Sequence, residues 1–232
     1  MNRIEKIFQN NRNVLIVCDC CGAPSMGESE ERLNIILDNG ADMVELYLPF
    51  SDPMADGAVL QAASQQALAN GSKLEYILNM LQRVRDKHPE AGFIITSYYN
   101  IFLQYGLDKL FTRFAELGID GMHIIDLPYE EHAEIDPYAE KYGVPQLRSV
   151  APASGEERTR LLMEHAQKMV YCYTPEQIPL IRKYSTLPIA IRAEVIVPGA
   201  DAVALDSAAA AVKTEDLAEF IRNYKKNCTV FQ

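Results

Sequence analysis

The sequence predicts an α/β fold in which strands and helices alternate to build a parallel sheet. Two observations support this. Short apolar runs of four to six residues recur along the chain, and most are followed by a longer segment whose apolar residues have helical spacing. The first run, residues 14–18, is apolar throughout, as strands buried on both faces are. We therefore expect helices to cover the sheet.

Eight of these runs are expected to be strands. They cover residues 14–18, 43–48, 93–96, 121–125, 145–150, 169–173, 188–191 and 202–205. A chain of 232 residues fits one (β/α)8 barrel, since such barrels typically have about 250 residues. No repeat, low-complexity linker or change in composition divides the chain. We expect a single domain over residues 1–232.

Helices are predicted between the strands from apolar periodicity and from end signals. They cover residues 4–11, 28–39, 59–70, 74–87, 107–117, 130–142, 154–166, 174–184 and 214–223. The first should carry Ile4, Ile7 and Phe8 on one side and close the bottom of the barrel. Ser154 and Glu157 have the spacing of a capping box at the start of their helix.

The barrel is expected to be abbreviated around strands six to eight. Residues 174–184 leave room for only one short helix before the seventh strand. Residues 195–200, between the seventh and eighth strands, are too few and too rich in Pro and Gly for an ordinary crossover helix.

Composition narrows the function classes. Thirty-two acidic residues against 22 Lys and Arg give a net charge of −10, which argues against nucleic acid or an anionic membrane as partner. No apolar run approaches the roughly 18 residues of a membrane span, and the first residues lack the apolar core of a signal peptide. We expect a cytoplasmic protein. No P-loop or dinucleotide glycine pattern occurs in a convincing setting, and no cofactor is expected.

Five cysteines, an odd number, fit reduced thiols better than a disulfide framework. Cys18, Cys20 and Cys21 allow a metal site as a minor alternative. In a strand, however, Cys18 and Cys20 point to one face and Cys21 to the other. No Cys or His pair at finger spacing follows, so we expect buried thiols and no metal.

Acidic residues gather where the second strand gives way to a loop. Glu45 lies in the strand and shares a face with Tyr47, whereas Asp56 lies in the loop that ends at Gly57. Barrel enzymes place their active sites at this end of the strands. The alternative is that both acids form salt bridges or caps, as most acids do.

The motif Glu-Leu-x-x-Pro-Phe-Ser-Asp-Pro-x-Ala-Asp-Gly at residues 45–57, followed by Gln61, resembles the signature of the tryptophan synthase alpha chain family. Further matches are Tyr98-Tyr-Asn100, residues 121–131 and Val150-Ala-Pro152. The resemblance covers roughly residues 14 to 160. It implies a TIM barrel lyase that cleaves indole-3-glycerol phosphate and releases indole.

The resemblance also implies roles for individual residues. Glu45 would be the general acid and base of a retro-aldol cleavage, and Asp56 would hold the indole ring nitrogen. Asp126 would support Asp56, with a structural cap as a close alternative. Tyr98 would lie near the pocket, with aromatic packing as an equal alternative. His123 lies within a strand, one residue out of step with the face expected to point inward, so we expect a packed, neutral side chain.

Histidines elsewhere are given no catalytic role. His88, His132 and His165 fall on predicted helices, and we expect them to be solvated.

The phosphate-binding region of the family is altered in this chain. Thr174-Pro175 replaces a long loop, Ile191-Arg192-Ala193 replaces Gly-Phe-Gly, and Asp206-Ser207 replaces Gly-Ser. A charge on Asp206 about 4 Å from a phosphate would cost about 1 kcal/mol in water and about 4 at intermediate dielectric. Arg192 would offset this charge or bind another anionic group, such as a carboxylate. Its structural alternative is a salt bridge to Glu194 or Asp206.

Two hypotheses follow. The favoured one is a lyase of the tryptophan synthase alpha type, acting on indole-3-glycerol phosphate or on a related indole-type substrate with a smaller or differently charged tail. Tyr98, Asp126, Arg192 and Ser207 would bind that substrate. The alternative is a catalytically weak paralogue that binds and activates a beta-type, pyridoxal-phosphate-dependent subunit through residues 53–57 and 98–104.

Overall fold

A computed structural model describes residues 2–11, 14–195 and 197–229. It contains eight parallel strands in the order β4-β3-β2-β1-β8-β7-β6-β5. An isolated bridge between Met122 and Gln146 joins the two end strands, so the sheet forms a nearly closed TIM barrel, as predicted. The strands are β1 (Val14–Cys20), β2 (Met43–Tyr47), β3 (Gly92–Ser97), β4 (Gly121–Ile124), β5 (Arg148–Val150), β6 (Val170–Cys172), β7 (Ile189–Arg192) and β8 (Ala202–Leu205).

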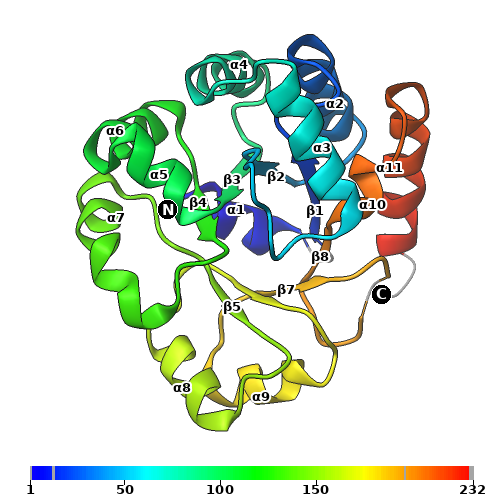
Figure 1. Cartoon of the computed structure of the whole chain (residues 1–232). Helices are drawn as coiled ribbons and strands as arrows, with labels where there is room; N and C mark the ends of the chain where they lie inside the picture. The colour runs from blue at the N-terminus through cyan, green and yellow to red at the C-terminus, as the bar shows by residue number, and fades with distance from the viewer. Residues whose placement is uncertain (1, 12–13, 196, 230–232) are drawn as a thin grey trace.

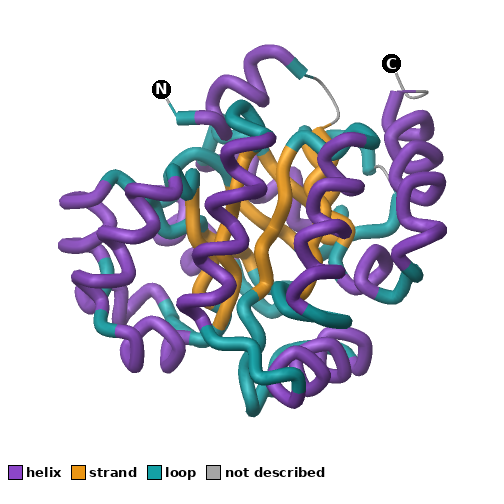
Figure 2. The backbone as a smooth tube through the Cα atoms, turned by 90° about the horizontal axis from the view of Figure 1, so that it is seen from above, coloured by secondary structure: helices purple, strands orange, loops and turns teal. Residues whose placement is uncertain are grey.

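Helices surround the barrel, as Figures 1 and 2 show. They are α1 (Arg3–Asn10), α2 (Met26–Asp38), α3 (Ala58–Ala69), α4 (Leu74–Lys87), α5 (Tyr99–Tyr105), α6 (Leu107–Leu117), the 3-10 helix η1 (Tyr129–Glu134), α7 (Asp136–Tyr142), α8 (Glu156–Glu164), α9 (Gln177–Tyr184), α10 (Ser207–Ala210) and α11 (Thr214–Thr229). Among the described helices, none is long and apolar enough to cross a membrane.

Helix α1 lies across one end of the strands (Figure 2). Ile4 is fully buried, and Ile7 and Phe8 pack against the same interior cluster, which confirms the predicted closure of the barrel bottom. Asn2 caps the helix in a capping box with Glu5. Its side-chain amide also donates to the Asp120 carbonyl at 2.8 Å, which fastens the helix to the segment before β4.

Alternating residues of the strands fill the barrel in layers. The lower layer is apolar and consists of Val14, Ile16, Met43, Ile94, Leu147, Met169, Tyr171, Ala190, Ala202 and Ala204. The next inward position on several strands is polar, with Glu45 on β2, Thr96 on β3 and Arg192 on β7. The interior therefore changes from apolar to polar toward the carboxyl ends of the strands.

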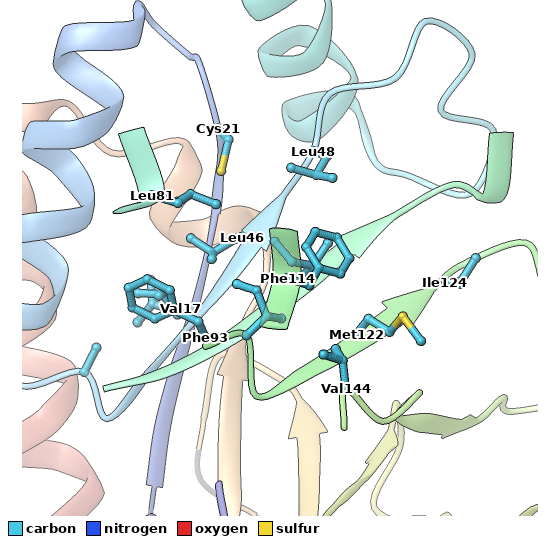
Figure 3. Close-up of a cluster of buried hydrophobic side chains, with 14 of the residues drawn as sticks. Val17, Cys21, Leu46, Leu48, Leu81, Phe93, Phe114, Met122, Ile124 and Val144 are labelled. Atoms are coloured by element: carbon cyan, nitrogen blue, oxygen red, sulfur yellow. The ribbon is translucent and has the colours of Figure 1, made fainter. Parts of the chain in front are cut away.

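The opposite faces of the strands form the outer core against the helices. Figure 3 shows part of it, where Val17, Leu46 and Phe93 from three strands meet Leu81 of α4 and Phe114 of α6. This apolar layer holds the helices on the sheet and leaves the strand ends free to carry polar groups.

The connection between β7 and β8 runs as a bare loop on one side of the barrel (Figure 1). Residues 193–195 and 197–201, the described part of this connection, contain no helix. The predicted abbreviation in this region is therefore confirmed.

Three local predictions were wrong. Residues 99–105, for which no helix was predicted, form helix α5, because Phe102 is buried against Phe114. Residues 130–142 are not one helix, since η1 ends at Glu134 and α7 begins at Asp136, with Pro137 in its first turn where a missing N–H is tolerated. The Ser154 capping box does not form, because Ser154 closes a turn with Ala151 and α8 begins after Gly155.

Candidate active site

A small cavity lies at the carboxyl ends of the strands. It has a volume of about 100 Å³ and is lined by Cys18, Glu45, Tyr47, Ala55, Asp56, Leu60, Thr96, His123, Ile125, Tyr173, Arg192 and Asp206. Larger cavities lie elsewhere, including one of about 250 Å³ next to β4 and β5 and one of about 310 Å³ beside α4 and α5. The small cavity is the one that brings Glu45 and Asp56 together, so the chemistry is sought there.

Glu45 is fully buried and lies on β2 with Tyr47 on the same face, as predicted. Its Oε1 accepts hydrogen bonds from Thr96 Oγ1 and Arg192 Nη2, each at 2.5 Å. Its Oε2 is buried and has no hydrogen-bond partner in the described part of the chain. Burial opposes ionisation of Glu45, but Arg192 and His123 outweigh it and hold the pKa below its ordinary value.

Arg192 is itself buried, with 8% of its side chain exposed. Besides Glu45, its guanidinium lies 3.6 Å from Asp206 and 4.5 Å from the centre of the Tyr171 ring. The predicted salt bridge to Asp206 is present but long, and Glu194 is exposed on the β7–β8 connection. The shorter of the two contacts is the one to Glu45, so Arg192 holds the carboxylate expected to act as acid and base.

Asp56 sits in the loop after β2 and is held by two tyrosines. The hydroxyls of Tyr47 and Tyr98 both donate to its Oδ2, the second at 2.8 Å. The Ala55 N–H donates to the Tyr98 hydroxyl at 2.9 Å, which closes the loop over the strand end. Burial and the bond to Asp56 raise the pKa of Tyr98 to about 12, so this hydroxyl stays protonated and remains a donor.

Asp126 and Ser207 lie outside the lining of the cavity as the structure describes it. Asp126 Oδ1 accepts from the Tyr99 N–H at 2.7 Å, at the start of α5. This is a cap, and it fixes the backbone next to Tyr98. Ser207 is the first residue of α10 and follows Asp206, which does reach the cavity.

The exit of β6 is tied down by Gln177, which sequence reasoning overlooked. The Gln177 Oε1 accepts from the backbone N–H groups of Tyr173 and Thr174, at 2.8 and 2.9 Å. Its Nε2 donates to the Val150 carbonyl of β5 at 2.6 Å. The short link between β6 and α9 is therefore fastened to the barrel, and two of its backbone donors are occupied.

His123 faces the cavity, so its predicted orientation was wrong. Its Nδ1 lies 3.4 Å from Arg192 Nη2, and its Nε2 lies 3.3 Å from the Ser149 hydroxyl. Burial and the neighbouring Arg192 lower its pKa to about 4, so the predicted neutral form holds near pH 7. Strand register could have revealed both Thr96 and His123, because Thr96 pairs with Tyr47 of β2 and His123 pairs in turn with Thr96.

Histidines away from the cavity differ in exposure. His165 is exposed, as predicted, whereas His88 and His132 are half-buried. His132 stacks on Tyr129 with ring centres 4.4 Å apart.

Three thiols of β1 and its exit divide between two faces as predicted. Cys18 and Cys20 lie in a separate buried cluster with Tyr47, and Cys21 lies in the outer core. All three are buried and free. The described residues contain no group of three or more His, Cys, Asp and Glu side chains that could hold a metal ion.

The similarity of this chain to known proteins points to one family. The family model described as tryptophan synthase alpha chain matches residues 4–179. The tryptophan synthase alpha chain of Bacteroides fragilis is 37% identical over 173 residues, which cover 74% of this chain and 65% of the relative's length. That match thus spans slightly less than two thirds of the relative.

Solved structures match over nearly the whole chain. A structure of a protein from Aquifex aeolicus VF5 is 30% identical, with a TM-score of 0.93 over 98% of this chain and 99% of its own. Tryptophan synthase subunit alpha from Legionella pneumophila is 28% identical, with a TM-score of 0.84 over 98% and 94% of the two chains.

Proposed function

The chain belongs to the tryptophan synthase alpha chain family, and we propose that it is a carbon–carbon lyase that releases indole from a 3-substituted indole by retro-aldol cleavage. The observation that carries the proposal is the meeting of Glu45 and Asp56 in one cavity. Glu45 presents a buried oxygen without a partner in the described chain, and Asp56 is held in place by two tyrosine hydroxyls.

Cleavage needs a group that first gives and then takes a proton. The protonated Glu45 carboxyl delivers a proton to indole C3, and the positive charge that forms on the ring is stabilised by Asp56 at the ring N–H. The Glu45 carboxylate then removes the proton of the side-chain hydroxyl. The bond between C3 and the side chain breaks, its electron pair returns to the ring, and indole and an aldehyde leave. Glu45 ends protonated, as it began.

The Glu45–Arg192 ion pair must open before this sequence can start. Arg192 favours the ionised form of Glu45, whereas the first step needs the acid. The cavity of about 100 Å³ is also smaller than the roughly 300 to 1,000 Å³ typical of ligand pockets. Asp206, 3.6 Å from Arg192, offers the guanidinium a second partner when a substrate ring displaces it.

Indole release by the purified protein tests the proposal. Indole-3-glycerol phosphate and its dephosphorylated form, indole-3-glycerol, serve as substrates, and Glu45→Gln serves as the blank. We expect Glu45→Gln to lower kcat/KM by about 10²- to 10⁴-fold, the usual contribution of a general acid or base. Glu31→Gln, an exposed acid on α2, should leave the rate unchanged. Undiminished release by Glu45→Gln would refute the assignment of Glu45.

A second candidate function is activation of a beta-type, pyridoxal-phosphate-dependent subunit. Met54 is 90% exposed in the loop that carries Asp56, and Leu103 is 48% exposed on α5. Both residues lie in the segments, 53–57 and 98–104, through which this candidate function would bind its partner, and an exposed apolar patch there would suit such a contact. A partner on this loop would reach the site through Asp56.

One assay with a tryptophan synthase beta chain distinguishes the two candidate functions. Under the second candidate, the Glu45→Gln protein still stimulates the beta chain, whereas Met54→Glu abolishes both stimulation and co-elution in gel filtration. Under the first candidate alone, the beta chain does not co-elute and indole release depends on Glu45.

A further inference from the structure

Resting on the lyase proposed above, we infer that the substrate is a 3-substituted indole whose tail is hydroxylated and uncharged, held by Arg192 and Asp206, and not a phosphate ester. The charges of the cavity, the pairing of Arg192 and the occupied donors at the β6 exit each point to this substrate class.

The charged groups around the cavity are predominantly acidic. Its lining holds three carboxyl groups, on Glu45, Asp56 and Asp206, against the single guanidinium of Arg192. His123 adds no positive charge near pH 7, because its pKa is lowered to about 4. A phosphate dianion would therefore enter a site that already carries an excess of negative charge.

Arg192 is not available as a phosphate-binding cation. Its Nη2 is bonded to Glu45 at 2.5 Å and its Nη1 lies 3.6 Å from Asp206. With only 8% of the side chain exposed, the guanidinium is enclosed by these two acids and the Tyr171 ring. If the Arg192 guanidinium leaves Glu45, it pairs with Asp206. One of the two carboxylates therefore always neutralises its charge.

Two backbone donors at the β6 exit that could cradle a phosphate are also occupied. Phosphate sites use several free N–H groups at turns and helix starts. Here Gln177 takes up the N–H groups of Tyr173 and Thr174 at the β6 exit. At the β8 exit, α10 has only four residues and follows the carboxylate of Asp206.

A hydroxyl group suits the same atoms. It can donate to the Asp206 carboxylate and accept from the Arg192 guanidinium at the same time, whereas a phosphate dianion has no hydrogen to donate to Asp206. The Asp206 side chain is 44% exposed at the edge of the cavity, so a tail that reaches it can extend toward solvent. These two residues therefore form a site for a polyol or simple alcohol tail.

Binding of two indoles that cannot be cleaved tests the inference. Indole-3-propanol and its phosphate monoester lack the carbinol hydroxyl that cleavage requires, and they differ only in the phosphate. Isothermal titration calorimetry is run on the wild type, on Asp206→Asn and on Glu194→Gln. The last removes the same charge from an exposed position on the β7–β8 connection.

We expect the wild type to bind the alcohol more tightly than the ester. Asp206→Asn should lower the Kd of the ester by about tenfold, the effect of removing one nearby charge at a partly exposed site. It should change the Kd of the alcohol less. Glu194→Gln should change neither. Tighter binding of the ester by the wild type, an unchanged ester affinity in Asp206→Asn, or no binding of either ligand overturns the inference. The wild-type comparison stands even if Asp206→Asn does not fold.

Turnover separates this inference from the lyase itself. If indole-3-glycerol phosphate is cleaved with a higher kcat/KM than indole-3-glycerol, the lyase is supported and the uncharged tail is refuted. If the alcohol binds more tightly than the ester but neither substrate yields indole that depends on Glu45, the lyase fails and the tail preference stands.

Discussion

Two buried ion pairs of this barrel differ in how completely their atoms are paired. Arg32 of α2 holds both oxygens of Asp19 on β1, at 2.9 and 3.0 Å, and also donates to the carbonyls of Val212 and Ala209. In the second pair, Thr96 and Arg192 both donate to one oxygen of Glu45, and the other oxygen has no partner in the described chain.

This difference distinguishes a structural pair, Asp19–Arg32, from the pair that we propose takes part in chemistry, Glu45–Arg192, which is called the chemical pair below. A buried ion pair repays the loss of water only when its remaining atoms are hydrogen-bonded. The Asp19–Arg32 pair meets that condition and joins a strand, a helix and the segment after α10. The Glu45–Arg192 pair leaves an oxygen unpaired beside a cavity, so a ligand can compete for it.

The largest expected effect breaks the structural pair. Arg32→Met should lower the free energy of unfolding by about 3–5 kcal/mol, because Asp19 would remain buried without a counter-charge. Urea denaturation measures the loss. The control is Arg83→Met, which removes an exposed pair with Glu30 and should cost about 0–1 kcal/mol. Equal losses in the two variants would show that the Asp19–Arg32 pair has no special structural weight.

The chemical pair should respond to pH in the opposite sense after Arg192→Met. In the wild type the Glu45 pKa is depressed, so its stabilisation is present above its ordinary value of about 4.5 and is lost as pH falls through the folded pKa. Arg192 is the largest of the influences that lower this pKa, so without it burial shifts the Glu45 pKa upward. The protonated form then stabilises the fold below about pH 4.5, and this contribution is lost as pH rises toward the raised folded pKa.

The measurable consequence is that the unfolding free energy of the variant depends on pH. As the pH falls from the raised folded pKa of Glu45 toward about 4.5, the unfolding free energy of Arg192→Met should increase, by at most about 1.4 kcal/mol for each pH unit. The double variant Glu45→Gln/Arg192→Met lacks the titrating carboxyl and should lose this slope. A flat profile for Arg192→Met would mean that Arg192 does not set the ionisation of Glu45.

A smaller effect extends the comparison to Asp56. Tyr98→Phe removes one of the two hydroxyls that hold Asp56 and should lower kcat/KM for indole release by about tenfold, since hydrogen bonds to charged groups contribute about 1.5–3 kcal/mol. Steady-state assays measure it. Tyr76→Phe, at a position 54% exposed on α4, is the matched control. An unchanged kcat/KM in Tyr98→Phe would show that Tyr47 alone positions Asp56.

The smallest expected effect concerns Asp126. Asp126→Ala removes the cap on the Tyr99 N–H and should cost about 1 kcal/mol of stability, with a smaller loss of activity than Tyr98→Phe. Thermal unfolding measures the first and indole release the second. Asp126→Asn keeps an acceptor and should recover most of the stability. A loss of activity larger than that of Tyr98→Phe would instead place Asp126 at the substrate.

Elements of the barrel were predictable where local pattern decides them. The apolar run at residues 14–18 predicts a strand wherever it lies, and the spacing of Ile4, Ile7 and Phe8 predicts the closing helix. Helix α5 was missed because Tyr98-Tyr-Asn100 has weak helix propensity. Its helix depends on burial of Phe102, which only the assembled core provides.

Pairings across the barrel were not predictable from neighbours in the chain. Sequence proximity offered Glu194 and Asp206 as partners of Arg192, but Glu45 lies 147 residues away. The pair forms because β2 and β7, which are not adjacent in the sheet, both point a side chain into the same interior. The acids of the site could be identified from the sequence, whereas the cation that controls Glu45 required the closed barrel.

The single bridge between β4 and β5 has a consequence for local opening of the fold. Seven neighbouring strand pairs are joined by ladders, whereas this seam is held by Met122 and Gln146 and by backbone bonds at Pro145 and Leu147. Few backbone bonds make a region the first to open under native conditions. Amide hydrogens of Met122 and Leu147 should therefore exchange with deuterium sooner than those of β1 and β2, and the barrel should begin to unroll from this seam.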